Sequence, residues 1–123
     1  MKYKIKTSEV PILSIKLKNA LTKSVPHELD FSIKNILVNG NKRGCSGFVR
    51  NKENGVVVYV MTEVSAYGGI GYLVRYARDE KDFTGCRNRN NQYSLADIVK
   101  EVKDMLENKT EWERELISFH KCS

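Results

Sequence analysis

The segment Val56–Val60 reads VVVYV and restricts the fold of this chain more than any other stretch. β-Branched side chains lose rotamer freedom in a helix, but they pack well on the pleated surface of a sheet. Consecutive valines place apolar groups on both faces of a strand, which is typical of a central, doubly covered strand. The preceding Asn51–Gly55 reads NKENG and predicts a tight hairpin with the arm Cys45–Arg50. The sequence therefore predicts a sheet built around this hairpin.

Alternating apolar and polar residues predict further strands on both sides of the hairpin. Leu29–Val38 and Tyr72–Tyr76 have strand-like patterns, and Lys2–Lys6 alternates lysines with Tyr and Ile as a half-solvated strand does. Asn39-Gly40 predicts a tight turn. Gly68–Gly71 reads GGIG, which suits a flexible hairpin connection better than a phosphate-binding loop, because no Walker lysine follows.

Three helices complete the predicted fold. Ser8 is a candidate N-cap for a helix that ends before Pro26, and Ser94 with Asp97 resembles a capping box for a second helix. Thr110 with Glu113 suggests the start of a third helix. The expected apolar stripes are Leu13, Leu17, Ala20 and Leu21; then Leu95, Ile98, Val99, Val102, Met105 and Leu106; then Trp112, Leu116, Ile117 and Phe119. The chain is therefore predicted to be a single α+β domain over residues 1–123, an antiparallel β-sheet with an N-terminal helix and two C-terminal helices.

Composition and charge narrow the classes of partner. The net charge of +6 is concentrated at the front, because residues 1–60 hold eleven Lys/Arg against four Asp/Glu. This excess suits an anionic partner. No run of eighteen apolar residues occurs and the first residues lack an apolar signal region, so we expect a cytoplasmic protein with no membrane partner. Cys45, Cys86 and Cys122 are expected to be reduced thiols, and their spacing with His120 matches no metal-site pattern.

The stretch Asp79–Tyr93 carries the most specific chemistry. It reads DEKDFTGCRNRNNQY and shows neither strand nor helix periodicity, which predicts a loop. Guanidinium groups suit phosphate, amides suit base edges and ribose hydroxyls, and aromatic rings suit stacking on a base. The stretch thus has the residues of a nucleotide site, although a solvated polar loop has a similar composition.

Catalytic signatures are weak. Neither His27 nor His120 falls in the Asp79–Tyr93 stretch, and Asp79, Glu80 and Asp82 are candidates for a general base or merely for ion pairs with neighbouring cations. We therefore predict a protein that binds without turning over its ligand, with no catalytic residue, no metal and no cofactor.

Three short motifs resemble a known family. They are Gly47–Asn51 (GFVRN) leading into the valine strand, Arg75–Asp79 (RYARD), and Lys81–Gly85 (KDFTG) with Asn88. Over about residues 45–107 the chain resembles the small phage proteins of the first Thoeris anti-defence family. The resemblance implies a sponge that sequesters the cyclic ADP-ribose isomer made by bacterial TIR-domain enzymes without degrading it, some members also capturing cyclic oligonucleotides. It also implies a homo-oligomer built from dimers, for example a hexamer, in the cytosol of a bacterial host, with ligand pockets at subunit boundaries. Cys86 departs from the family, in which a second glycine is expected there.

With such a ligand, the residues of the stretch take separate roles. Arg87 and Arg89 are expected at the pyrophosphate, Asp82, Asn88 and Asn90 at the hydroxyls, and Phe83 or Tyr76 at the base, with Asn91 in the same ligand-binding set. The helices from Ser94 onward are expected to contribute to the subunit contact. The principal alternative is a nucleic-acid-binding or anti-CRISPR-like inhibitor, in which lysines and the Arg/Asn loop follow a phosphate backbone; nucleic acid is the less favoured partner.

Overall fold

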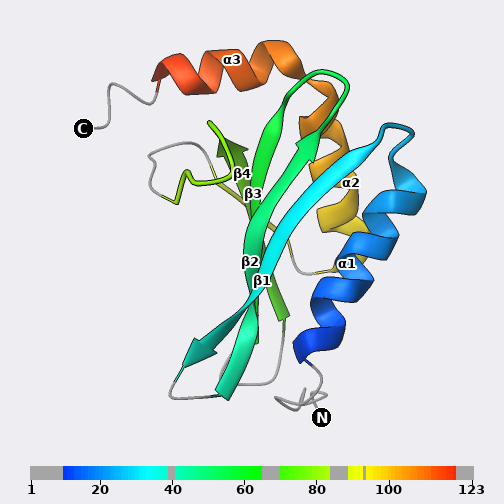
Figure 1. The fold of residues 1–123 in the computed structure, drawn as a ribbon, viewed down its shortest axis with the longest axis vertical. Helices are drawn as coiled ribbons and strands as arrows, with labels where there is room; N and C mark the ends of the chain where they lie inside the picture. Colours follow the sequence, from blue (N-terminus) through cyan, green and yellow to red (C-terminus); the bar gives the residue numbers. More distant parts are fainter. Residues whose placement is uncertain (1–9, 39–40, 65–69, 84–88, 93, 119–123) are drawn as a thin grey trace.

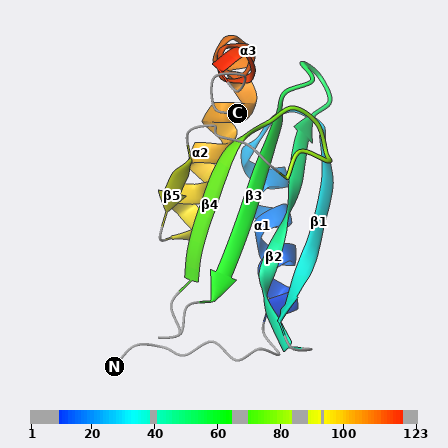
Figure 2. The ribbon, with the colours of Figure 1, turned by 90° about the vertical axis from the view of Figure 1, so that its left-hand side faces the viewer.

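The computed structural model describes residues 10–38, 41–64, 70–83, 89–92 and 94–118. The elements in chain order are α1 (Val10–Ser24), β1 (Leu29–Val38), β2 (Asn41–Asn51), β3 (Val57–Val64), β4 (Ile70–Ala77), β5 (Asn90–Gln92), α2 (Leu95–Glu107) and α3 (Lys109–Ser118). The five strands form one antiparallel sheet in the order β1-β2-β3-β4-β5. Figure 2 shows this order across the sheet, with α1 and α2 behind it. The predicted α+β fold, with one N-terminal and two C-terminal helices, is confirmed.

The strand β3 lies in the centre of the sheet and is covered on both faces. Val58 and Val60 point toward α1 and α2 and belong to the main core, whereas Val57 belongs to a small cluster with Phe48 and Ala77 on the other face. All three valines are at most 1% exposed. The interpretation of the valine run as a doubly buried central strand is confirmed.

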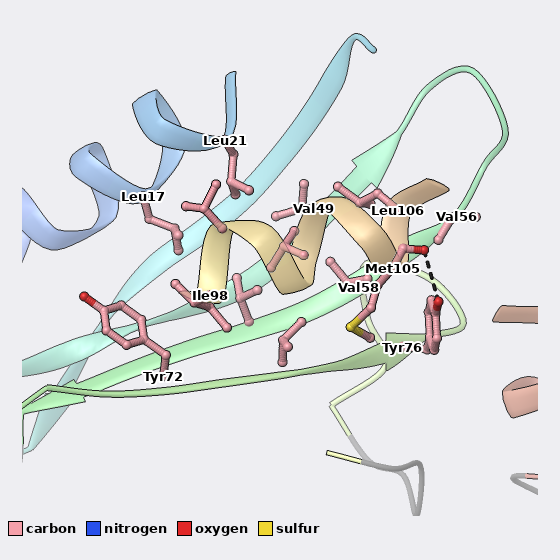
Figure 3. Packing of buried hydrophobic residues seen from close by; sticks show 14 residues of the cluster. Leu17, Leu21, Val49, Val56, Val58, Tyr72, Tyr76, Ile98, Met105 and Leu106 are labelled. Carbon is pink, nitrogen blue, oxygen red and sulfur yellow. Dashed lines mark hydrogen bonds between the residues drawn. The ribbon is translucent and has the colours of Figure 1, made fainter. Parts of the chain in front are cut away.

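The main core fills the space between the sheet and the two long helices (Figure 3). Leu17 and Leu21 from α1 meet Val102 and Leu106 from α2, and each of the four is fully buried. These side chains follow the i, i+4 spacing of one helix face, which is why the sequence placed them in apolar stripes. In Figure 1 both helices lie on the same side of the sheet.

The β2–β3 hairpin ties the sheet to the end of α2. The amide N–H of Gly55, whose φ is +83°, donates to the carbonyl oxygen of Asn51 at 2.8 Å, and the positive φ explains the glycine. The side-chain amides of Asn51 and Asn54 both donate to the carbonyl oxygen of Leu106, at 3.1 and 2.9 Å. Carbonyls in the last turn of a helix lack helical hydrogen-bond donors. The two asparagine side chains of this hairpin supply donors to one of them.

Of the predicted helix starts at Ser94 and Thr110, the first is confirmed and the second is wrong. Ser94 is the N-cap of α2, and its hydroxyl accepts a 3.1 Å hydrogen bond from the N–H of Asp97. The predicted start of α3 at Thr110 is wrong, because the Asn108 side chain accepts from the N–H of Glu111 at 3.1 Å and the helix begins at Lys109. Asparagine is a stronger N-cap than threonine, and α2 ends just before it.

Part of the predicted loop Asp79–Tyr93 is a strand. The segment Asn90–Gln92 forms β5 and pairs with Tyr72–Val74 of β4. This edge strand has three polar residues and therefore no alternation of apolar and polar side chains in the sequence. Backbone pairing alone defines it. The predicted strand Lys2–Lys6, the cap Ser8 and the turn Asn39-Gly40 lie outside the described residues.

Candidate functional site

An aromatic cluster occupies the face of the sheet opposite the helices. Phe48 on β2 and Tyr59 on β3 are directly paired across the strands, and Phe83 from the segment after β4 completes a group that we call the ring cluster (Phe48, Tyr59, Phe83). The Phe83 ring lies edge-on to Phe48 with centroids 5.0 Å apart and to Tyr59 at 6.3 Å. Phe48 is 1% exposed, but Phe83 is 66% exposed. The cluster thus presents one ring to solvent and fixes it with two others.

Arg75 lies beneath the ring cluster. It is the β4 partner of Tyr59, and its guanidinium carbon is 4.6 Å from the centroid of the Tyr59 ring. Its Nη1 and Nη2 donate to the carbonyl oxygens of Tyr76 at 3.1 Å and Asp82 at 2.6 Å. Because the side chain is only 2% exposed, these carbonyls and the ring compensate the buried charge. Arg75 therefore positions the segment that carries Phe83.

Carboxylates hold the turn before Phe83 in shape. Asp79 accepts from the N–H of Lys81 at 2.8 Å, and Asp82 accepts from the N–H of Arg78 at 2.8 Å. Such side-chain-to-backbone bonds replace a regular ladder in turns. The turn lies on the side of the sheet away from α1 and α2 (Figure 1). The acidic residues considered as general bases thus have a structural use as parts of this turn.

An ion pair fastens the same turn to β2. The Nε atom of Arg50 lies 2.8 Å from a carboxylate oxygen of Glu80, although its N–H is not directed along a hydrogen bond. The side chain of Arg50 is 41% exposed, and it stands two residues from Phe48 on the same face of the strand. A partly exposed guanidinium therefore lies next to the ring cluster.

A hollow lies on the face of the sheet opposite the ring cluster, between β4, β5 and the C-terminal helices. Its volume is about 310 Å³, and the residues that line it are Tyr76, Asn90, Glu101, Asp104, Met105, Asn108, Glu111 and Glu115. Four of the eight are acidic, so this hollow has a negative potential that disfavours a phosphate.

Tyr76 and Asn90 have protein partners in this hollow. The Tyr76 hydroxyl donates to the carbonyl oxygen of Met105 at 3.1 Å (Figure 3), and the Asn90 amide donates to Glu101 at 2.9 Å. Burial raises the pKa of Tyr76 above its ordinary value, and the charges of Glu111, Glu101 and Glu115 raise it further. The hydroxyl is therefore a neutral hydrogen-bond donor near pH 7.

The structure divides the predicted site residues between the two faces of the sheet. Asp82 and Phe83 lie at the ring cluster, whereas Tyr76 and Asn90 lie at the acidic hollow. Asn91 is exposed and pairs with Leu73, so it points to the face opposite its neighbour Asn90. Arg89 is exposed, and Arg87 and Asn88 lie outside the described residues.

The sequence-based site missed Phe48, Arg50, Tyr59 and Arg75. Phe48 and Arg50 are two apart on β2, and Tyr59 and Arg75 are their neighbours across β3 and β4. A period of two places residues on one face of each strand, but only the register between strands brings three strands' residues into one row. The sequence shows the alternation within each strand, but it does not show the register that brings residues of different strands together.

The cysteines and a possible metal site were also considered in the sequence. Cys45 is buried, and its Sγ is 2.9 Å from the hydroxyl oxygen of Thr62; burial raises the pKa of this thiol. Cys86, Cys122 and His120 lie outside the described residues. Within the described ranges no group of three or more His, Cys, Asp or Glu side chains is arranged to hold a metal ion. Nor is any helix in this part of the chain long and apolar enough to cross a membrane.

No protein-family model, curated protein or solved structure matches this chain.

Proposed function

We propose that this chain is a phage-type anti-defence sponge that binds a cyclic ADP-ribose-type nucleotide and holds it unchanged, which would block Thoeris signalling. The observation that supports the proposal most is the geometry of Phe83. Its ring is 66% exposed, yet two aromatic neighbours and the Arg75-bound turn fix its orientation. A large exposed ring costs hydrophobic free energy, and a fixed one loses little entropy when a base stacks on it.

Polar residues on β2 and at β5 suit the rest of such a nucleotide. Arg50 is partly exposed two residues from Phe48 on β2, and Arg89, the residue before β5, is exposed. Guanidinium groups bind phosphate oxygens through paired hydrogen bonds. Asn91, also exposed, offers a side-chain amide on the same face of the sheet.

Phe83 is 66% exposed, so tight binding at this ring calls for a cover. Sequestration requires a Kd of about 1 nM, or about −12 kcal/mol. Stacking contributes ~1–3 kcal/mol per base, and a charge-assisted hydrogen bond ~1.5–3 kcal/mol. We propose that a second copy of the chain closes over the ligand and supplies the remainder. Ile117, which is 70% exposed on α3, is a candidate residue for contact between copies.

The first experiment identifies the ligand and its fate. The purified protein is incubated with a nucleotide mixture that includes cyclic ADP-ribose isomers, washed, denatured by heat, and the released compounds are weighed by mass spectrometry. Unaltered nucleotide is the expected result. A product of changed mass would indicate an enzyme, and release of no nucleotide would contradict the proposal.

Matched variants test the role of Phe83. Phe83→Ala should weaken binding at least tenfold, while Phe83→Tyr, which keeps the ring, should bind nearly as wild type. Affinity is measured at two salt concentrations, because binding to a nucleic-acid polymer weakens steeply with salt through counterion release. A steep salt dependence together with binding of single-stranded DNA would favour the nucleic-acid-binding alternative.

A further inference from the structure

A groove separates the two long helices on the face of the sheet opposite the ring cluster. Its volume is about 470 Å³, and it is lined by Ala20 and Ser24 of α1 and by Leu95, Ala96, Val99, Lys100 and Lys103 of α2. The helices contact each other below it and lie side by side in Figure 1. The groove is thus remote from the proposed nucleotide site, and the inference drawn from it is independent of that proposal.

Small side chains make the groove hollow. Ala20 and Ser24 are one turn apart on α1, and Ala96 faces them from α2. Larger residues such as Leu17, Leu21 and Val102 lie deeper and are fully buried in the core. The floor is therefore apolar and recessed, a shape that accepts side chains from outside.

Lysines stand on both sides of this floor. Lys100 and Lys103 line the α2 side. On α1, Lys16 and Lys23 are exposed and stand four residues before and three after Ala20, so they share its side of the helix. Within the described residues, none of these four ammonium groups is paired with a carboxylate.

The charges of α2 are partly separated by side, with Asp97 and Glu107 within one turn of Lys100 and Lys103. Glu101 and Asp104 line the acidic hollow on the opposite flank of the helix, while Lys100 and Lys103 line the groove. A solvated helix face more often mixes the two signs. Among the described residues, those that line the groove include two lysines and no carboxylate, which gives an apolar floor a positive rim, and charge complementarity specifies its occupant.

We infer that this groove binds an acidic amphipathic α-helix of a partner protein. Apolar side chains at i, i+3/i+4 and i+7 enter the groove, and carboxylates on both sides of that stripe meet the lysines. A helix fits better than a lipid surface, because a bilayer takes up projecting apolar side chains, whereas Ala20, Ala96 and Val99 form a recess.

The test uses a defined probe. A fluorescein-labelled, hydrocarbon-stapled helical peptide carries leucines at i, i+4, i+7 and i+11 with glutamates on both sides of them, and a control peptide has lysines in place of the glutamates. Anisotropy titration should give a roughly micromolar Kd for the acidic peptide, and the basic peptide should bind at least tenfold more weakly.

Variants locate the binding. The pair Lys100→Glu and Lys103→Glu should weaken the acidic peptide at least tenfold and strengthen the basic one, and Ala20→Arg should block the floor. Lys34→Glu makes the same kind of charge change at an exposed position of β1, outside the groove, and should leave peptide binding unchanged. If Ala20→Arg fails to fold, as judged by circular dichroism, the two lysine positions keep the test decisive.

Several results would overturn the inference. One is the absence of saturable binding of the acidic peptide, and another is equal binding by the basic peptide or by the lysine-to-glutamate pair. Co-sedimentation with phosphatidylglycerol vesicles that depends on Lys100 and Lys103, without peptide binding, would assign the surface to lipid. Loss of self-association in Ala20→Arg by light scattering, again without peptide binding, would assign the groove to a second copy of the chain.

Discussion

The side-chain amide of Asn51, at the end of β2, donates a 3.1 Å hydrogen bond to the carbonyl oxygen of Leu106 near the end of α2. The same side chain accepts from the N–H of Glu53 at 2.9 Å, so one buried residue shapes the hairpin and anchors the helix to it. Asn51 is fully buried, and removal of its amide leaves the N–H of Glu53 without this acceptor and the Leu106 carbonyl with Asn54 as its remaining side-chain donor.

We therefore expect Asn51→Ala to lower the free energy of unfolding by about 2–3 kcal/mol. Urea denaturation followed by circular dichroism measures the change. Asn19→Ala, at an exposed position of α1, is the control and should be neutral or slightly stabilising because alanine has the higher helix propensity. Equal stability of the two variants would show that the link between hairpin and helix contributes nothing measurable.

Gly47→Ala should prevent stable folding. A Cβ atom at this position would lie 1.9 Å from the carbonyl oxygen of Ser32 and 2.5 Å from the Cα of Ile33, both of them backbone atoms of β1. The strands would have to separate locally, and we expect a loss of more than about 4 kcal/mol. Thermal melting and soluble yield are the measurements.

Gly55→Ala is the matched control for that change. No atom lies within 4 Å of the added Cβ there, and the cost comes from the positive φ of +83° alone. A loss of about 1–2 kcal/mol is expected. Should Gly47→Ala melt no lower than Gly55→Ala, the close approach of β1 and β2 would be refuted.

Phe48 and Phe83 belong to one cluster, but truncation should cost far more stability at Phe48 than at Phe83. Phe48→Ala removes a buried ring that is 1% exposed, and we expect a loss of ~3–5 kcal/mol in stability. Phe83→Ala removes a largely exposed ring, and the loss should be about 1 kcal/mol, the size of an aromatic pair contact. Differential scanning calorimetry compares the two. A large loss for Phe83→Ala would mean that this ring serves the fold and not a ligand.

Tyr76 gives a prediction for alkaline pH. Its pKa is raised in the folded state, whereas in the unfolded chain it is about 10. The neutral hydroxyl therefore stabilises the fold below about pH 10, and this contribution is lost as the pH rises from there toward the folded-state value. Stability measured between pH 8 and 12 should fall, and Tyr76→Phe should reduce the fall while lowering stability at pH 8 by about 1 kcal/mol. An identical alkaline decline in the two proteins would exclude Tyr76 as its source.

The strands and long helices were predictable because their patterns are local. The valine run, the Asn51–Gly55 turn and the Ser94 cap each need only neighbouring residues to be read. The strand β5 was missed because only its pairing with β4 defines it. The Asn108 cap was missed because α3 follows α2 after this single residue.

The candidate site depends more on the register between strands than on the loop composition. Asn90 and Asn91 look equivalent in a polar stretch, yet they face opposite sides of the sheet once β5 pairs with β4. Phe48, Tyr59 and Phe83 come from three separate parts of the chain. No local pattern shows that three such rings meet.

The strand order has a consequence for how the chain folds. Each strand pairs with its neighbour in sequence, so a growing chain can add β1 to β5 one after another with short loop closures. The helix α2 comes after all five strands, yet it covers Val49, Val58 and Val60. Until α2 has been synthesised, much of the apolar face of the sheet is open to other chains. We therefore expect fast formation of the sheet, followed by a vulnerable interval during translation that ends when α2 docks.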